Sequence, residues 1–69
     1  MKAIRVSVGF NEWSKVDDFL REFRHEDDTF TYQVDNVTFV AVCEDEDAMD
    51  WFKARLLTDF EEPIIVDLK

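Results

Sequence analysis

The hydrophobic pattern of this chain changes period several times within 69 residues, and these changes limit the possible folds more than any other feature. Residues 4–10 alternate strictly, which predicts a half-buried strand with Ile4, Val6, Val8 and Phe10 on one side. Residues 11–26 switch to helical spacing, with Asn11 or Ser14 as the expected N-cap. The predicted apolar stripe of this helix contains Trp13, Val16, Phe19, Leu20 and Phe23.

Residues 29–43 read as a β-hairpin with a two-residue turn at Asp35-Asn36, since both residue types tolerate positive φ. Such a turn places Val34 opposite Val37 and sets which side chains face the core. The expected core side carries Phe30, Tyr32, Val34, Val37, Phe39, Ala41 and Cys43. The expected outer side carries Thr29, Thr31, Gln33, Thr38, Val40 and Val42.

A second helix is predicted over residues 44–60, because Met49, Phe52, Leu56 and Phe60 recur at helical spacing. Residues 64–68 alternate again and predict a last strand. The resulting order, β-α-β-β-α-β, is that of the ferredoxin-like α+β fold, a four-stranded antiparallel sheet with two helices on one face. The chain length allows a single domain over residues 1–69.

Charge narrows the kind of partner. Seventeen acidic residues oppose eight basic ones, for a net charge of −9, which disfavours nucleic acid and anionic membranes and favours basic partners. Solubility alone is the simpler explanation of the same charge. One cysteine excludes an intrachain disulfide, and no signal peptide or membrane span is seen, so we expect a cytoplasmic protein.

The predicted topology brings two acidic segments together. In this topology the link from the first helix to the second strand and the link from the third strand to the second helix lie at the same end of the sheet. Glu61 and Glu62 lie at the opposite end. The expected partner-binding residues are Glu26, Asp27, Asp28, Glu44, Asp45, Glu46, Asp47 and, one turn into the second helix, Asp50. Helix capping explains the second segment, but Glu26 to Asp28 follow a helix C-terminus, which the helix dipole disfavours for anions.

No catalytic, metal or cofactor motif accompanies these acids. The acidic run lacks the spacing and the glycine of a calcium loop, and no Ser-His-Asp set, phosphate loop or CxxC is present. RNA-recognition domains share the topology, but only Phe39 and Val40 match their third-strand motif, and the expected outer side offers no stacking aromatics. We therefore expect a protein without enzymatic activity and without a cofactor.

Two functions remain open. In size, acidity and lack of enzymatic motifs, the chain resembles small phage-encoded inhibitors of host defence, the anti-CRISPR and anti-restriction DNA mimics. That resemblance implies that carboxylates imitate DNA phosphates and block the DNA-binding surface of a CRISPR complex or nuclease in the host cytoplasm. The alternative is a ferredoxin-like regulatory or dimerisation module that acts through the outer sheet side, where Val40, Val42 and Ile65 are expected to form a small apolar stripe.

Overall fold

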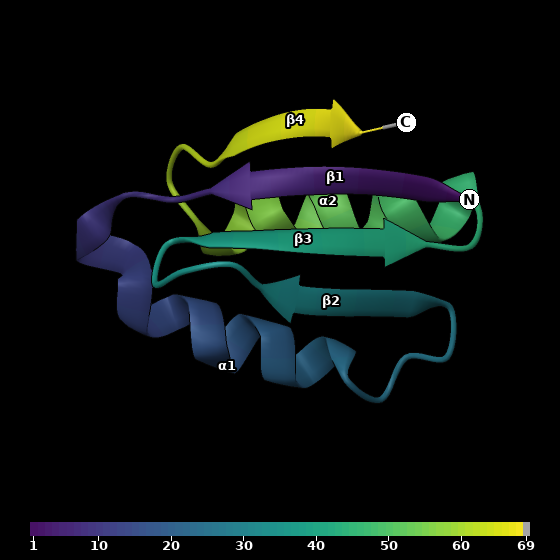
Figure 1. Ribbon diagram of the computed structural model, residues 1–69, viewed down its shortest axis with the longest axis horizontal. Helices are drawn as coiled ribbons and strands as arrows, with labels where there is room; N and C mark the ends of the chain where they lie inside the picture. Colours follow the sequence, from purple (N-terminus) through teal and green to yellow (C-terminus); the bar gives the residue numbers. More distant parts are fainter. Residues whose placement is uncertain (69) are drawn as a thin grey trace.

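The computed structural model describes residues 1–68 and contains one four-stranded antiparallel sheet and two α-helices (Figure 1). The strands lie in the order β2-β3-β1-β4. In chain order the elements are β1 (Lys2–Ser7), the 3₁₀ turn η1 (Phe10–Glu12), α1 (Trp13–Phe23), β2 (Thr29–Gln33), β3 (Thr38–Cys43), α2 (Glu46–Asp59) and β4 (Ile64–Leu68). The predicted α+β class and the two helices are confirmed.

The core is built around phenylalanine rings from both helices and from β3. Phe52 of α2 is fully buried, and its ring centroid lies 5.4 Å from that of Phe19 and 4.6 Å from that of Phe23 in α1. The ring centroids of Phe39 in β3 and Phe60 after α2 lie 6.1 Å and 5.3 Å from the ring centroid of Phe19. Edge-on and tilted pairs of this kind add to the free energy of burial, so aromatic contacts help to hold the two helices together.

The hairpin between β2 and β3 differs from the prediction by one residue. The Val34 N–H donates to the Thr38 carbonyl at 2.8 Å, so three residues rather than two form the loop. The Asp35 carboxylate accepts from the Val37 N–H at 2.9 Å and stabilises this longer turn. A two-residue type I′ turn needs positive φ at both central positions, and none of the described residues adopts it.

That extra residue reverses the two sides of β2. Phe30 pairs with Val42 and Tyr32 with Val40, so both aromatic residues lie on the outer side of the sheet with Val40 and Val42. Thr29, Thr31 and Gln33 pair with Cys43, Ala41 and Phe39 and therefore face the helices. The predicted sides of β2 were wrong, because they followed from a two-residue turn that placed Val34 opposite Val37 instead of Thr38.

The last strand is reversed as well. Ile65 pairs with Val6 and packs against the core, so the prediction that Ile65 belongs to the outer stripe was wrong. Asp67 pairs with Ile4 and reaches Lys53 of α2 at 3.3 Å. The outer side instead carries Ile64, Val66 and Leu68.

The first helix begins differently from its predicted start. Strand β1 ends at Ser7. The side chains of Phe10 and Trp13 are exposed by 82% and 59%, so the expectation that both join the core was wrong. Neither η1 nor α1 has a side-chain cap, so the predicted caps at Asn11 and Ser14 were wrong. The buried position one turn before Val16 is occupied by Glu12, which is 6% exposed.

Glu12 joins the start of α1 to the segment that leads into β4. Its carboxylate accepts from the Glu61 N–H at 3.2 Å and from Lys15 Nζ at 3.1 Å. A buried carboxylate is tolerated when donors of this kind satisfy it, and here one donor belongs to a segment 49 residues away.

We predict that Glu12→Ala lowers the free energy of unfolding by about 1–3 kcal/mol, because it leaves the Glu61 N–H without its acceptor. Glu12→Gln keeps a side-chain carbonyl and is expected to lose less. Asp18→Ala, an exposed acid on the same helix, is the control. Urea denaturation measures all three, and equal losses for the Glu12 and Asp18 alanine variants would contradict this role.

Candidate functional site: an apolar sheet face between acidic ends

Two surfaces stand out once the sheet register is known. We call the first the open face: the side of the sheet away from the buried residues of the helices. Its residues are Ala3, Arg5, Ser7, Phe30, Tyr32, Thr38, Val40, Val42, Ile64, Val66 and Leu68. We call the second the acidic end, formed by Glu26, Asp27 and Asp28 together with Glu44, Asp45, Glu46 and Asp47.

The open face is strongly apolar and well exposed. The side chains of Phe30 and Ile64 are exposed by 65% and 64%, and that of Tyr32 by 51%. The rings of Phe30 and Tyr32 lie 6.2 Å apart and tilted, as neighbours along one strand. Val40 is covered by its neighbours to 7% exposure and forms the floor between Tyr32 and Arg5. The predicted pair of Val40 and Val42 does lie on this face, within a far larger apolar surface than expected.

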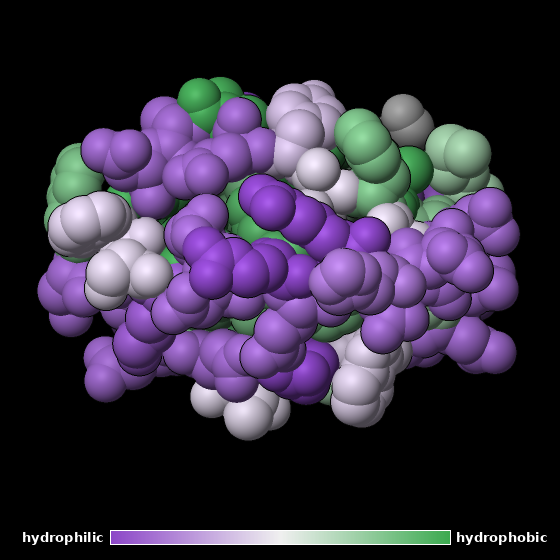
Figure 2. Space-filling view, turned by 90° about the horizontal axis from the view of Figure 1, so that it is seen from below, coloured by the Kyte–Doolittle hydropathy of each residue, from purple (hydrophilic) through white to green (hydrophobic). Residues whose placement is uncertain are grey.

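Not one open-face residue is acidic, in a chain with seventeen acidic residues. Arg5, on central strand β1, is the charged residue of the face and lies opposite Val40 and Val66. By contrast, the side of the molecule where α1 lies is predominantly hydrophilic (Figure 2). The acids are therefore kept off one side of the sheet.

The two predicted acidic segments do lie side by side. The Glu44 N–H donates to the Asp28 carbonyl at 2.9 Å, which extends the pairing of Thr29 with Cys43 by one step. The predicted proximity of residues 26–28 and residues 44–47 is therefore observed. Their side chains are exposed except for Asp28, which is half-buried and accepts from the Thr29 hydroxyl at 3.1 Å.

Part of the acidic end has a structural role. The Asp45 carboxylate accepts from the Ala48 N–H at 2.8 Å and caps α2, while Glu46 and Asp47 occupy the first turn, where the helix dipole favours anions. Lys2 of β1 also lies 3.4 Å from Glu46 and offsets its charge. Glu26, Asp27 and Glu44 neither cap a helix nor lie in the first turn of one.

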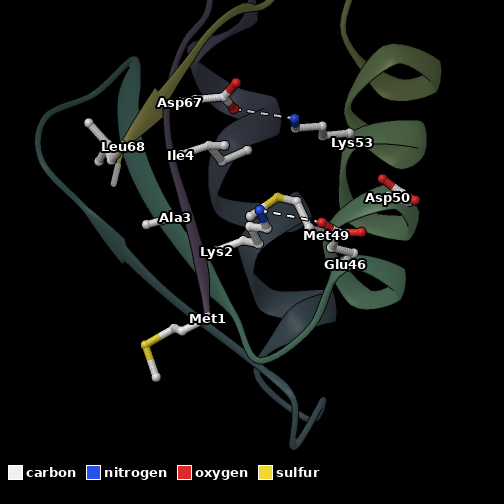
Figure 3. Close-up of a pocket in the computed structure, with 10 residues that line it drawn as sticks. All are labelled: Met1, Lys2, Ala3, Ile4, Glu46, Met49, Asp50, Lys53, Asp67 and Leu68. Atoms are coloured by element: carbon white, nitrogen blue, oxygen red, sulfur yellow. Dashed lines mark hydrogen bonds and ion pairs between the residues drawn. The ribbon is translucent and has the colours of Figure 1, made fainter.

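A groove of about 440 Å³ separates α2 from β1 and β4 (Figure 3). Two ion pairs cross it, Lys2 with Glu46 and Lys53 with Asp67, the second at 3.3 Å. Asp50, predicted to extend the acidic surface, lines this groove with Glu46. Because each lysine is already paired, the groove offers little free positive charge to an anionic ligand.

The other candidate metal ligands are His25 and Cys43. In the described part of the chain, no three His, Cys, Asp or Glu side chains are placed to hold a metal ion together. His25 is exposed after α1, and Cys43 is fully buried in the core, as its position in the hairpin predicted. Neither helix within residues 1–68 is long and apolar enough to cross a membrane.

Burial and the neighbouring acids change the pKa of the Cys43 thiol. Burial raises its pKa, the hydrogen bond with the Thr29 hydroxyl lowers it, and the carboxylates of Asp28 and Asp45 raise it further. The net effect is a raised pKa, which keeps the thiol neutral and disfavours a reactive thiolate.

We therefore predict a loss of stability at alkaline pH that depends on Cys43. The unfolded thiol ionises near pH 8.5. The folded pKa is higher, so the contribution of Cys43 is complete below about pH 8.5 and is lost as the pH rises through the folded value. Urea denaturation at about pH 7 and about pH 10 is expected to show a larger loss for the wild type than for Cys43→Ala. Equal losses in the two proteins would contradict the raised pKa.

No protein-family model matches the sequence, and comparison with curated proteins and with solved structures finds no match.

Proposed function

We propose that the protein is a non-enzymatic interaction module of the ferredoxin-like βαββαβ type, which binds another macromolecule through the open face of its sheet. The observation that carries this proposal is the exposure of Phe30, Tyr32 and Ile64 on a face without carboxylates. Contiguous apolar surface on a small protein is costly in water and commonly marks a binding site.

The ferredoxin-like assignment is supported by the strand order β2-β3-β1-β4 and by the antiparallel pairing of every neighbouring pair. Contacts of Phe52 with Phe19 and Phe23 are expected when both helices share one side of the sheet. Such an arrangement leaves the other side uncovered, which is where the module is proposed to act.

A second candidate is favoured by the contact between the two acidic segments. The Glu44 N–H to Asp28 carbonyl bond brings Glu26, Asp27 and Glu44 to one end of the molecule. Carboxylates grouped in this way support an inhibitor that imitates the charge of nucleic acid and occupies the basic groove of a host defence effector, such as a CRISPR complex or a nuclease. This candidate places the protein in the host cytoplasm.

Substitution on the open face tests the first candidate. We expect Phe30→Thr with Tyr32→Thr to abolish affinity capture of the partner, because threonine keeps the strand propensity but removes the apolar rings. Trp51→Gln with Leu57→Gln removes exposed apolar side chains from α2 and is the matched control. Capture by the first variant at the wild-type level, measured by quantitative mass spectrometry, would eliminate the open face as the site.

Charge reversal tests the second candidate. We expect Glu26→Lys with Glu44→Lys to abolish capture, and duplex DNA to compete with the wild-type protein for the captured partner. Asp17→Lys with Asp18→Lys changes the net charge equally, but on the exposed side of α1 and away from both ends of the sheet. Asp47 is left unchanged, because lysine in the first turn of α2 would oppose the helix dipole. Capture that persists in about 1 M salt, where the Debye length is about 3 Å, would argue against a charge mimic.

A further inference from the structure

The open face has the dimensions of a docking site for one helix. Strands lie about 4.8 Å apart and rise about 3.3 Å per residue, so four strands of about five residues span roughly 19 by 17 Å. An α-helix of about 12 residues is about 18 Å long and crosses such a face completely. Helices cover only one side of this sheet, and a helix on the other side would complete a three-layer arrangement.

The area of the face limits what can bind there stably. A surface of roughly 19 by 17 Å has a flat area of about 300 Å², whereas a standard interface buries about 800 Å² on each partner. A partner that also contacts the residues past the ends of the strands buries more surface than the face alone provides. The residues beyond those ends decide which partner gains free energy by doing so.

Acidic residues lie beyond both ends of the face. At one end, Asp28 precedes Phe30 by two residues and Glu44 follows Val42 by two, and Phe30 pairs with Val42. At the other end, Glu62 precedes Ile64 by two residues, and Asp35 lies in the loop after β2. Carboxylates thus border the apolar centre at both ends of the sheet, and Lys2, where β1 begins, is paired with Glu46.

This border disfavours a second copy of the chain as the occupant. Two open faces stacked together place acidic ends over acidic ends in either orientation, and each chain brings a net charge of −9. The same border attracts a basic partner, whose lysine and arginine side chains extend the interface over both ends. Nucleic acid, which could stack on Phe30 and Tyr32, is repelled by that charge.

We propose that the open face binds an amphipathic helix of another protein, with an apolar stripe that covers Phe30, Tyr32 and Val66 and with basic residues that reach the acids at both ends. This inference rests on the proposed function, since it assigns a partner to the same face. Arg5 adds one requirement: the partner meets it with a carboxylate or a backbone carbonyl, because a guanidinium buried without an acceptor is costly.

The test uses three synthetic peptides of about 18 residues, long enough to form a helix that covers the face. The first places leucine at helical spacing and lysine elsewhere. The second has the same composition in an order without an apolar stripe. The third keeps the leucine stripe and replaces every lysine with glutamate. Each is titrated into the ¹⁵N-labelled full-length protein at physiological salt and followed by amide NMR.

The first peptide is expected to bind at least about tenfold more tightly than either of the others, a difference of about 1.4 kcal/mol. Its titration is expected to shift the amides of Phe30, Tyr32 and Val66. Phe30→Thr with Tyr32→Thr is expected to weaken it at least about tenfold, whereas Trp51→Gln with Leu57→Gln leaves it unchanged. Amide spectra of the free variants establish that each is folded.

Other outcomes overturn the inference in distinguishable ways. Equal binding of the first two peptides means that charge alone is recognised, and the amphipathic partner is wrong. Tight binding of the glutamate peptide to the open face overturns the basic partner and leaves the face as a binding site. A dimer in sedimentation equilibrium that Phe30→Thr with Tyr32→Thr dissociates makes a second copy the occupant. A monomer that binds none of the peptides at the open face overturns the amphipathic helix as the occupant, and capture with the Phe30→Thr and Tyr32→Thr variant decides the proposed function separately.

Discussion

The length of the loop between β2 and β3 determines which side chains of β2 are exposed to solvent. The Val34 N–H to Thr38 carbonyl bond and the Asp35 carboxylate set its length at three residues. Since successive side chains of a strand point to opposite sides, one additional residue turns every side chain of β2 over. Phe30 and Tyr32 then lie on the outer side of the sheet. The open face depends on this one register, whereas chain direction alone brings the two acidic segments to one end.

The division of labour between the two sides of the sheet follows from the core. Phenylalanine rings from α1, α2 and β3 fill the side next to the helices, so β2 needs to contribute only Thr29, Thr31 and Gln33 there. The Glu12 carboxylate completes this side by joining α1 to the segment before β4. A core that is satisfied without Phe30, Tyr32, Ile64 or Val66 leaves these residues for the open face. The apolar surface of the open face is thus exposed because the phenylalanine rings already fill the side of the sheet that faces the helices.

Charge and hydrophobicity are arranged together. The carboxylates that solubilise the chain lie on the helices, beyond the ends of the strands and, for Asp67, on the side of β4 that faces α2, and the open face carries none. Electrostatic attraction by such a border acts over the Debye length and brings a basic partner to the face, while contact with the aromatic rings supplies short-range free energy. Asp45, Glu46 and Asp47 also stabilise the start of α2, so the same residues serve folding and the surface potential.

The sequence by itself determined the four strands and the two α-helices, because each of these segments has a clear period of two or 3.6 residues, but it did not predict η1. It also determined that Glu26 to Asp28 and Glu44 to Asp47 would share one end, since chain direction alone requires it. Only the tertiary structure decided the sides of β2 and β4, because alternation shows which residues share a side but not which side is covered. Trp13 and Glu12 illustrate the same limit: helical spacing allows either position to face inward, and the donor from Glu61 makes the carboxylate the buried one.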